Sequence, residues 1–135
     1  IAAGNDVVSP HEPNDPRQAR IKKTTLGDVC GKHFSGWCFM IKRSLWEEIG
    51  GFDTDVNFWC SDDAVIEQVL AKGVTPMLVK ESIVEHQRST TLSGVPRNQQ
   101  EELTWRNVYI FNTKYGKSKF VDHPDYQRWM KRNVR

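Results

Sequence analysis

Residues 34–53 read FSGWCFMIKRSLWEEIGGFD, and this stretch decides how the rest of the chain is interpreted. The apolar run at 39–41 predicts a strand. Ser44 followed by Glu47 predicts a helix N-cap with its capping-box partner, and the Gly-Gly pair at 50–51 predicts the end of that helix. A strand that leads at once into a short helix favours an α/β or α+β fold class.

Residues 58–73 continue the pattern with FWCSDDAVIEQVLAKG. Ser61 is a second N-cap candidate, and Asp62 and Asp63 fall in the first helical turn, where the helix dipole favours negative charge. Apolar residues then recur at helical spacing until Gly73, which predicts the helix end. The sequence therefore predicts a helix that presents two carboxylates at its start.

Further elements are expected on both sides. The run at 6–9 predicts a strand ended by Pro10. Residues 74–80 predict either an edge strand or one that begins at Met77, because Pro76 has no N–H to donate. Helices are expected over 99–114 and 124–132, loops over 10–32 and 87–98, and a short apolar piece at 83–85 leads to His86.

The composition narrows the class of protein. A chain of 135 residues fits one domain, and 38% apolar with 27% charged residues is typical of a globular protein. The net charge of +2 is too balanced to favour nucleic acid as a partner. The three cysteines have no CxxC spacing, which favours reduced thiols over disulfides or zinc ligands. Without an apolar run long enough for a transmembrane segment and without a signal peptide, a cytoplasmic location is expected.

These motifs, taken in order, resemble the C-terminal half of glycosyltransferases with the GT-A fold, of the inverting family 2 type. The matching features are the Gly36 turn, the strand and helix that end in GGFD at 50–53, the acidic helix start, and VEH at 84–86. The polypeptide N-acetylgalactosaminyltransferases are similar in the same region. The resemblance covers roughly residues 5–92 and is looser in the last third of the chain.

The resemblance implies a partial GT-A (Rossmann-like) fold, in which short mixed strands and packed helices form the C-terminal half. Within a single domain over 1–135, residues 1–97 would be the acceptor-side half and 98–135 a C-terminal helical extension. The chain does not begin with Met and has too few expected strands for a complete doubly wound sheet. It is therefore expected to be a fragment whose N-terminal half is missing.

The resemblance also implies a reaction. A sugar would pass from a nucleotide-sugar donor, expected to be a UDP-sugar, to an acceptor hydroxyl with inversion, assisted by Mn²⁺ or Mg²⁺. The family holds nucleotide and metal through an Asp-x-Asp motif in its N-terminal half, so this chain alone is expected to be inactive. Asp53-Thr54-Asp55 fits that spacing, but it follows GGF directly, where the family's Asp is structural, and is rejected as the metal motif.

The resemblance assigns roles to individual residues. Asp62 lies eleven residues before Gly73, as the family's catalytic base does, although Ser61 replaces the usual preceding Glu. A carboxylate at a helix start is rigidly aimed and can take the proton of the attacking hydroxyl. His86 matches the position that completes the metal site, because one ring nitrogen can bind the ion. The expected substrate-binding residues are Gly36, Trp37, Trp59, Asp63 and Arg88.

Each assignment has an ordinary structural alternative. Asp62 and Asp63 would also stabilise a helix start, His86 would make a simple hydrogen bond, and the tryptophans would pack in the core. Arg88 would lie in a solvated loop. Two other functions also stay open: a non-catalytic carbohydrate- or partner-binding module of the same fold, and a metal-dependent hydrolase that uses Asp62, Asp63 and His86. The other histidines, His11, His33 and His123, are expected at the surface or in loops.

Overall fold

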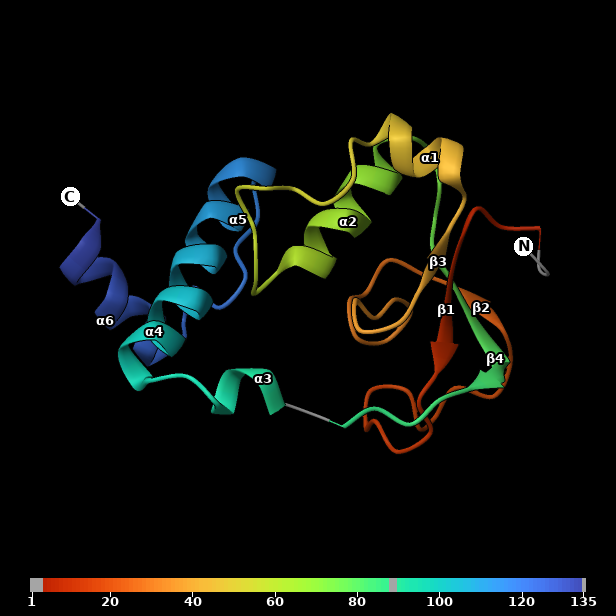
Figure 1. Ribbon diagram of the computed structural model, residues 1–135, viewed down its shortest axis with the longest axis horizontal. Helices are drawn as coiled ribbons and strands as arrows, with labels where there is room; N and C mark the ends of the chain where they lie inside the picture. The colour runs from red at the N-terminus through yellow and green to blue at the C-terminus, as the bar shows by residue number, and fades with distance from the viewer. Residues whose placement is uncertain (1–3, 88–89, 135) are drawn as a thin grey trace. The chain divides into compact units, whose positions relative to one another are not determined.

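The computed structural model describes residues 4–87 and 90–134, without the side chains of Thr90 and Thr91. The chain divides into two compact units. The first combines Ile1–Phe52 with Asp62–Arg88, and the second combines Asp53–Ser61 with Ser89–Arg135. The first unit holds a small sheet with helices, and the second is helical (Figure 1). The expected boundary between residues 97 and 98 stays a prediction.

A four-stranded mixed sheet organises the first unit. β1 and β4 pair in parallel at its centre, while β3 pairs antiparallel with β1 and β2 antiparallel with β4. The resulting order is β2-β4-β1-β3. The strands are β1 (Val7–His11), β2 (Thr25–Leu26), β3 (Met40–Ile41) and β4 (Met77–Ile83). A mixed sheet with helices confirms the predicted α/β class.

Several strand predictions need correction. Pro10 lies inside β1, opposite Val79, instead of ending the strand. This is tolerated because the β3 ladder covers only Val7 and Val8, so the missing Pro10 N–H interrupts no bond on that side. β4 does begin at Met77, but it is an inner strand, because β2 forms within the segment expected to be a loop and covers its outer edge.

Two helices complete the first unit: α1 (Arg43–Glu48) and α2 (Ser61–Leu70). Ser44 is not the N-cap of α1; that position belongs to Lys42, which makes no side-chain capping bond. The Lys42 N–H donates to the Asp6 carbonyl at 2.8 Å, which fixes the chain in an extended conformation just before the helix. Gly73 adopts φ 75° and closes the turn after α2, as predicted.

The core of the first unit fixes α2 against the sheet. Val65, Ile66 and Val69 of α2 pack in one cluster with Val7 of β1 and Leu45 of α1, and all are almost completely buried. Phe34 joins this cluster from the loop before β3. Burial of several large apolar side chains, each worth about 1.5–3 kcal/mol, holds the start of α2 in a fixed position.

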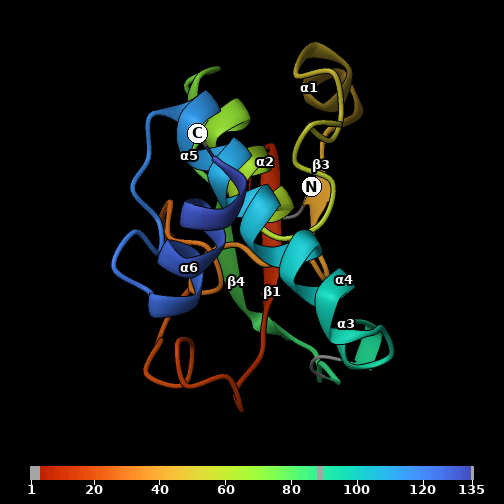
Figure 2. The ribbon, with the colours of Figure 1, turned by 90° about the vertical axis from the view of Figure 1, so that its left-hand side faces the viewer.

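The second unit is built from helices that pack through aromatic side chains. Its core includes Val108, Phe111, Tyr126 and Trp129, and the rings of Tyr109 in α5 and Trp129 in α6 lie 6.0 Å apart. Figure 2 shows the helices of this unit. The elements are α3 (Thr90–Ser93), α4 (Arg97–Glu101), a π-helical segment (Glu102–Arg106), α5 (Asn107–Tyr115) and α6 (Pro124–Asn133).

The helix predictions for this unit are largely confirmed. The expected helix at 99–114 corresponds to the uninterrupted run from α4 through α5, which contains the π-helical segment, and Gly116 ends it at φ 63°. The expected helix at 124–132 is α6, which begins at Pro124. The loop expected at 87–98 is wrong in part, because α3 forms within it. None of the helices in the described residues is long and apolar enough to cross a membrane.

Candidate functional site

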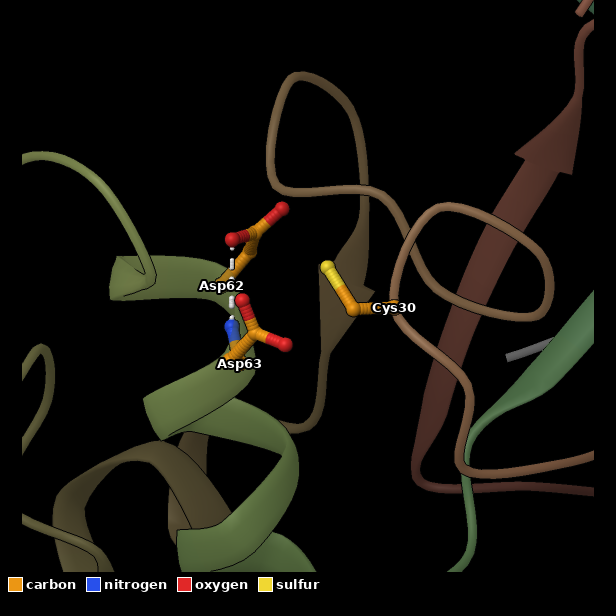
Figure 3. Close-up of side chains that lie close together, drawn as sticks. All are labelled: Cys30, Asp62 and Asp63. Carbon is orange, nitrogen blue, oxygen red and sulfur yellow. Dashed lines mark hydrogen bonds between the residues drawn. The ribbon is translucent and has the colours of Figure 1, made fainter. Parts of the chain in front are cut away.

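The candidate site is centred on Asp62, which lies half-buried in the first turn of α2. Its Oδ1 accepts the backbone N–H of Asp63 at 3.1 Å (Figure 3). The buried face of α2 anchors the helix, so the Asp62 carboxylate projects from a fixed base beside the positive end of the helix dipole. This arrangement limits how far the acid can move.

Gly36 lies directly against Asp62. A Cβ added at Gly36 would stand 2.6 Å from the Cβ of Asp62, closer than two such atoms approach in proteins. The absence of a side chain therefore allows the turn at 35–38 to pack on the acid. The resemblance assigned Gly36 to substrate binding, whereas the neighbour that requires a glycine here is Asp62 itself.

A hydrogen-bonded network holds this turn in place. The Ser35 N–H donates to Ser9 Oγ at 3.1 Å, and Ser9 Oγ in turn donates to the Cys38 carbonyl at 3.1 Å. The Gln18 amide donates to the Gly31 carbonyl at 3.0 Å and to Ser35 Oγ at 3.2 Å. Ser9, Gln18 and Ser35 are all buried, so the backbone beside Asp62 is rigid.

The same turn carries the contact to His86. The Trp37 and His86 rings stack with centroids 4.8 Å apart and planes inclined by 9°. Because Trp37 directly follows Gly36, Asp62 and His86 both pack against one short turn. In the described residues, neither ring nitrogen of His86 has a hydrogen-bond partner, so the imidazole keeps the capacity to bind a ligand.

The backbone of His86 is fixed by a buried acid. The His86 N–H donates to Glu12 Oε2 at 2.6 Å, and the other carboxylate oxygen of Glu12 accepts the Asn14 N–H at 2.9 Å. Just before it, the Val84 N–H donates to the His11 carbonyl at 3.0 Å, which continues the parallel pairing of β1 with β4. The Glu12 carboxylate thus continues the hydrogen bonding of the two strands beyond their backbone pairing. It fixes the position of the His86 backbone just after the sheet.

The prediction for His11 is wrong. It is 2% exposed, and its Nε2 lies 3.2 Å from the Gln18 carbonyl, while its Nδ1 has no partner among the described residues. The reason is that β1 runs on through Pro10 into the interior of the first unit. Sequence reasoning also missed Glu12 and Gln18, because a loop containing three prolines gave no signal that its polar side chains are buried.

Cys30 joins the two aspartates in space. A ligand atom from each of Cys30, Asp62 and Asp63 lies within 4.8 Å of the others, and all three side chains are half-buried (Figure 3). One cation could contact all three. However, a thiol beside carboxylates is not the all-oxygen set that Mg²⁺ prefers. The sequence gave no sign of this cluster, because Cys30 lies far from the aspartates along the chain.

His86 does not belong to that cluster or to any other group of three potential ligands in the described part of the chain. Its open ring nitrogens fit one coordination position of a divalent ion such as Mn²⁺. The remaining positions would have to be filled by other groups. As a metal ligand, His86 therefore stays a prediction.

For two of the expected site residues, a position beside Asp62 stays a prediction. Trp59 belongs to the second unit, is 38% exposed, and donates its backbone N–H to the Leu103 carbonyl at 3.4 Å. Arg88 lies outside the described residues. The structure places Gly36 and Asp63 against Asp62, and it stacks Trp37 on His86.

The guanidinium of Arg17 interacts electrostatically with this site. Hydrogen bonds from its guanidinium to Asp15 are the largest cause of its raised pKa, and Asp62 and Cys30 add to the effect through space. Asp62 therefore lies within the field of a guanidinium that is already paired with another acid. All three cysteines are free thiols, as the sequence predicted.

Comparison with known proteins does not assign this chain to a family. Neither a protein-family model nor a curated protein nor a solved structure matches the chain. The functional argument consequently depends on the residues themselves.

Proposed function

We propose that this chain forms the acceptor side of an inverting nucleotide-sugar glycosyltransferase of the GT-A type, with Asp62 as the catalytic base. One observation carries the proposal: Asp62 and His86, far apart in sequence, pack against the two neighbouring residues Gly36 and Trp37. The four residues come from three separate segments, and each segment is anchored by buried contacts.

The proposed sugar transfer requires one carboxylate that is positioned to act as a base. In a direct displacement the acceptor oxygen bonds to the anomeric carbon as the bond from that carbon to the diphosphate oxygen breaks. The proton of the acceptor hydroxyl passes to the base. Asp62 suits this role because it projects from an anchored helix and, in the described residues, forms no ion pair that would occupy it.

Trp37 and His86 would serve the donor side of the reaction. The stack fixes the plane of the imidazole, so that one ring nitrogen can face the leaving diphosphate or its metal. A bound Mn²⁺ or Mg²⁺ would neutralise the negative charge that develops on the diphosphate. We place the rest of the donor site, including an Asp-x-Asp motif, outside these 135 residues.

The experiment measures release of nucleoside diphosphate by the protein that contains this chain. A panel of UDP-, GDP- and dTDP-sugars is supplied with Mn²⁺ and simple sugar acceptors. Asp62→Asn is expected to lower turnover by about 10²–10⁴-fold, the usual contribution of a general base, while binding of the sugar nucleotide is retained. Glu67→Gln removes one negative charge from the same helix and serves as the matched control, with turnover preserved.

The outcomes separate the candidate functions. Full turnover by Asp62→Asn would remove the assignment of the base. Absence of turnover with every donor, together with retained binding of a carbohydrate, would favour the non-catalytic module. Metal-dependent cleavage of a simple phosphodiester, lost in Asp62→Asn and Asp63→Asn alike, would favour the hydrolase, for which the contact between the two aspartates and Cys30 is the supporting observation.

A further inference from the structure

A concave region lies in the first unit, between β1 and β3 in the chain and on both sides of β2. It is a pocket of about 490 Å³, within the size range of small-molecule sites. Five of its lining side chains are basic or histidine, and none of the described lining residues is acidic. The five are Arg17, Arg20, Lys23, Lys32 and His33. One sign of charge gathered in a concave site raises the local concentration of ligands of the opposite charge.

Three of these cations form no ion pair with the described residues. Arg20, Lys23 and Lys32 are exposed, and no carboxylate of residues 4–87 or 90–134 lies within ion-pair distance of them. The chain as a whole is nearly balanced in charge, so this gathering of unpaired cations is local. An anion that entered the pocket would relieve the repulsion among them.

Arg17 is already oriented for such a ligand. Its Nε and Nη2 donate to the two oxygens of Asp15 at 3.0 and 2.7 Å, and Asp15 is 3% exposed. Nη1 then lies over Gly31, where an added Cβ would stand 2.0 Å from it. A guanidinium fixed in this way loses little conformational entropy when it binds an anion.

His33 adds a neutral donor. The Val29 N–H donates to its Nδ1 at 3.3 Å, so the proton of the neutral ring is on Nε2. Burial is the main cause of a lowered His33 pKa; the charge of Lys32 lowers it further, and that of Asp28 opposes the shift in part. The ring packs on Gly27, where an added Cβ would stand 2.1 Å from Nδ1, so its position is fixed.

We propose that this pocket binds the phosphate group of a small phosphorylated ligand. Phosphate offers several strong acceptor oxygens, and the pocket combines a fixed guanidinium with mobile ammonium groups and an imidazole donor. A small ligand fits the observations better than a nucleic acid, because the cations surround one hollow instead of lining a long stripe.

The pocket also adjoins the candidate site. Arg17 lies within the electrostatic field of Asp62, and Cys30 of the aspartate cluster stands between Val29, which lines the pocket, and Gly31. The bound phosphate would therefore belong to the acceptor whose hydroxyl meets Asp62. This last step depends on the proposed function, whereas the binding of phosphate does not.

The test is calorimetric titration of the protein that contains this chain with inorganic pyrophosphate, in EDTA and at constant ionic strength. EDTA removes divalent metal, so a metal-dependent donor site cannot contribute. We expect saturable binding that Lys23→Gln and Arg20→Gln each weaken by about tenfold, as loss of one charge-assisted contact predicts. Lys22→Gln is the matched control: Lys22 is the exposed neighbour of Lys23, it does not line the pocket, and its substitution should leave binding unchanged.

Three results would overturn the proposal. The first is no saturable binding by a protein whose circular dichroism shows it to be folded. The second is an equal loss in Lys22→Gln and Lys23→Gln, which would indicate only general attraction to positive charge. The third is much tighter binding of a short oligonucleotide than of pyrophosphate, which would replace the small ligand with nucleic acid. Since no turnover is measured, these results stand apart from the test of glycosyl transfer.

Discussion

Two acidic pairs close together in the sequence have different surroundings in the structure. Asp53 and Asp55 belong to the second unit, where Asp53 accepts the Tyr115 hydroxyl at 2.6 Å and Lys114 Nζ at 2.9 Å. Asp55 accepts the same ammonium group at 2.7 Å. Asp53 is only 8% exposed, so its carboxylate is largely satisfied by the protein itself.

Asp62 of the other pair has no ion-pair partner in the described part of the chain; its Oδ1 accepts one backbone N–H. The comparison shows that the residue type alone does not decide the role of an acidic pair. Donors fill the coordination sites of Asp53 and make it a structural link, whereas Asp62 keeps an oxygen that can accept a proton. The rejection of Asp53-Thr54-Asp55 as a metal motif agrees with this structural role.

The largest expected effect tests the structural half of the comparison. Asp53→Asn keeps the shape of the side chain but removes the charge that Tyr115 and Lys114 bind. Loss of hydrogen bonds to a buried charged group is expected to lower the free energy of unfolding by about 2–3 kcal/mol. Amide hydrogen exchange in α5, measured at Asn107–Tyr115, should accelerate accordingly.

Asp55→Asn is the matched control for this measurement. Asp55 shares Lys114 with Asp53, but its side chain is 64% exposed, and pairs of that kind contribute little. Exchange in α5 should therefore change much less. If both variants accelerated exchange equally, burial of Asp53 would not be the reason for its structural role.

A smaller effect is expected from a change beside Asp62, the catalytic side of the comparison. Gly36→Ala places a Cβ where it must displace Asp62 or the turn, and overpacking of this kind costs about 1–2 kcal/mol. Turnover should fall more than the stability loss explains, because the proposed base moves. Gly50→Ala is the control: it strains a residue at φ 78° but meets no atom within 4 Å, so it should lower stability without a specific loss of turnover.

The sequence predicted the elements better than the contacts between them. Helix periodicity placed α2, α5 and α6, because apolar spacing is a local property. The strands were harder, since Pro10 inside β1 and the two-residue β2 depend on pairing with β4, a partner distant in sequence. Propensity cannot register such long-range pairing.

The same difference between local features and long-range contacts holds for the candidate site. The family resemblance singled out Asp62 at a helix start and His86 after a strand, but it did not predict the contact of Asp62 with Gly36 or the stacking of His86 on Trp37. Glu12, Gln18 and Cys30 gave no local signal, because their roles arise only when the long loop folds back on the sheet. Buried polar residues in loops are recognisable only once their partners are known.

The smallest expected effect is a change in how stability depends on pH under acidic conditions. Burial raises the pKa of Asp53, but hydrogen bonds from Tyr115, Lys114 and the Asp55 N–H outweigh it, so the pKa lies below its ordinary value of 3.8. A lowered pKa in the folded state means that the stabilisation is complete above about pH 3.8 and is lost as pH falls through the folded value. Urea unfolding of the native protein, followed by circular dichroism from pH 5 to about pH 2, should therefore show a steeper decline in stability than Asp53→Asn shows, since other acids such as Glu81 titrate in both. Asp55→Asn should keep it. Parallel curves for the native protein and Asp53→Asn would mean that the Asp53 carboxylate is no better stabilised in the folded chain than in water, and the contrast between the two acidic pairs would then have no energetic basis.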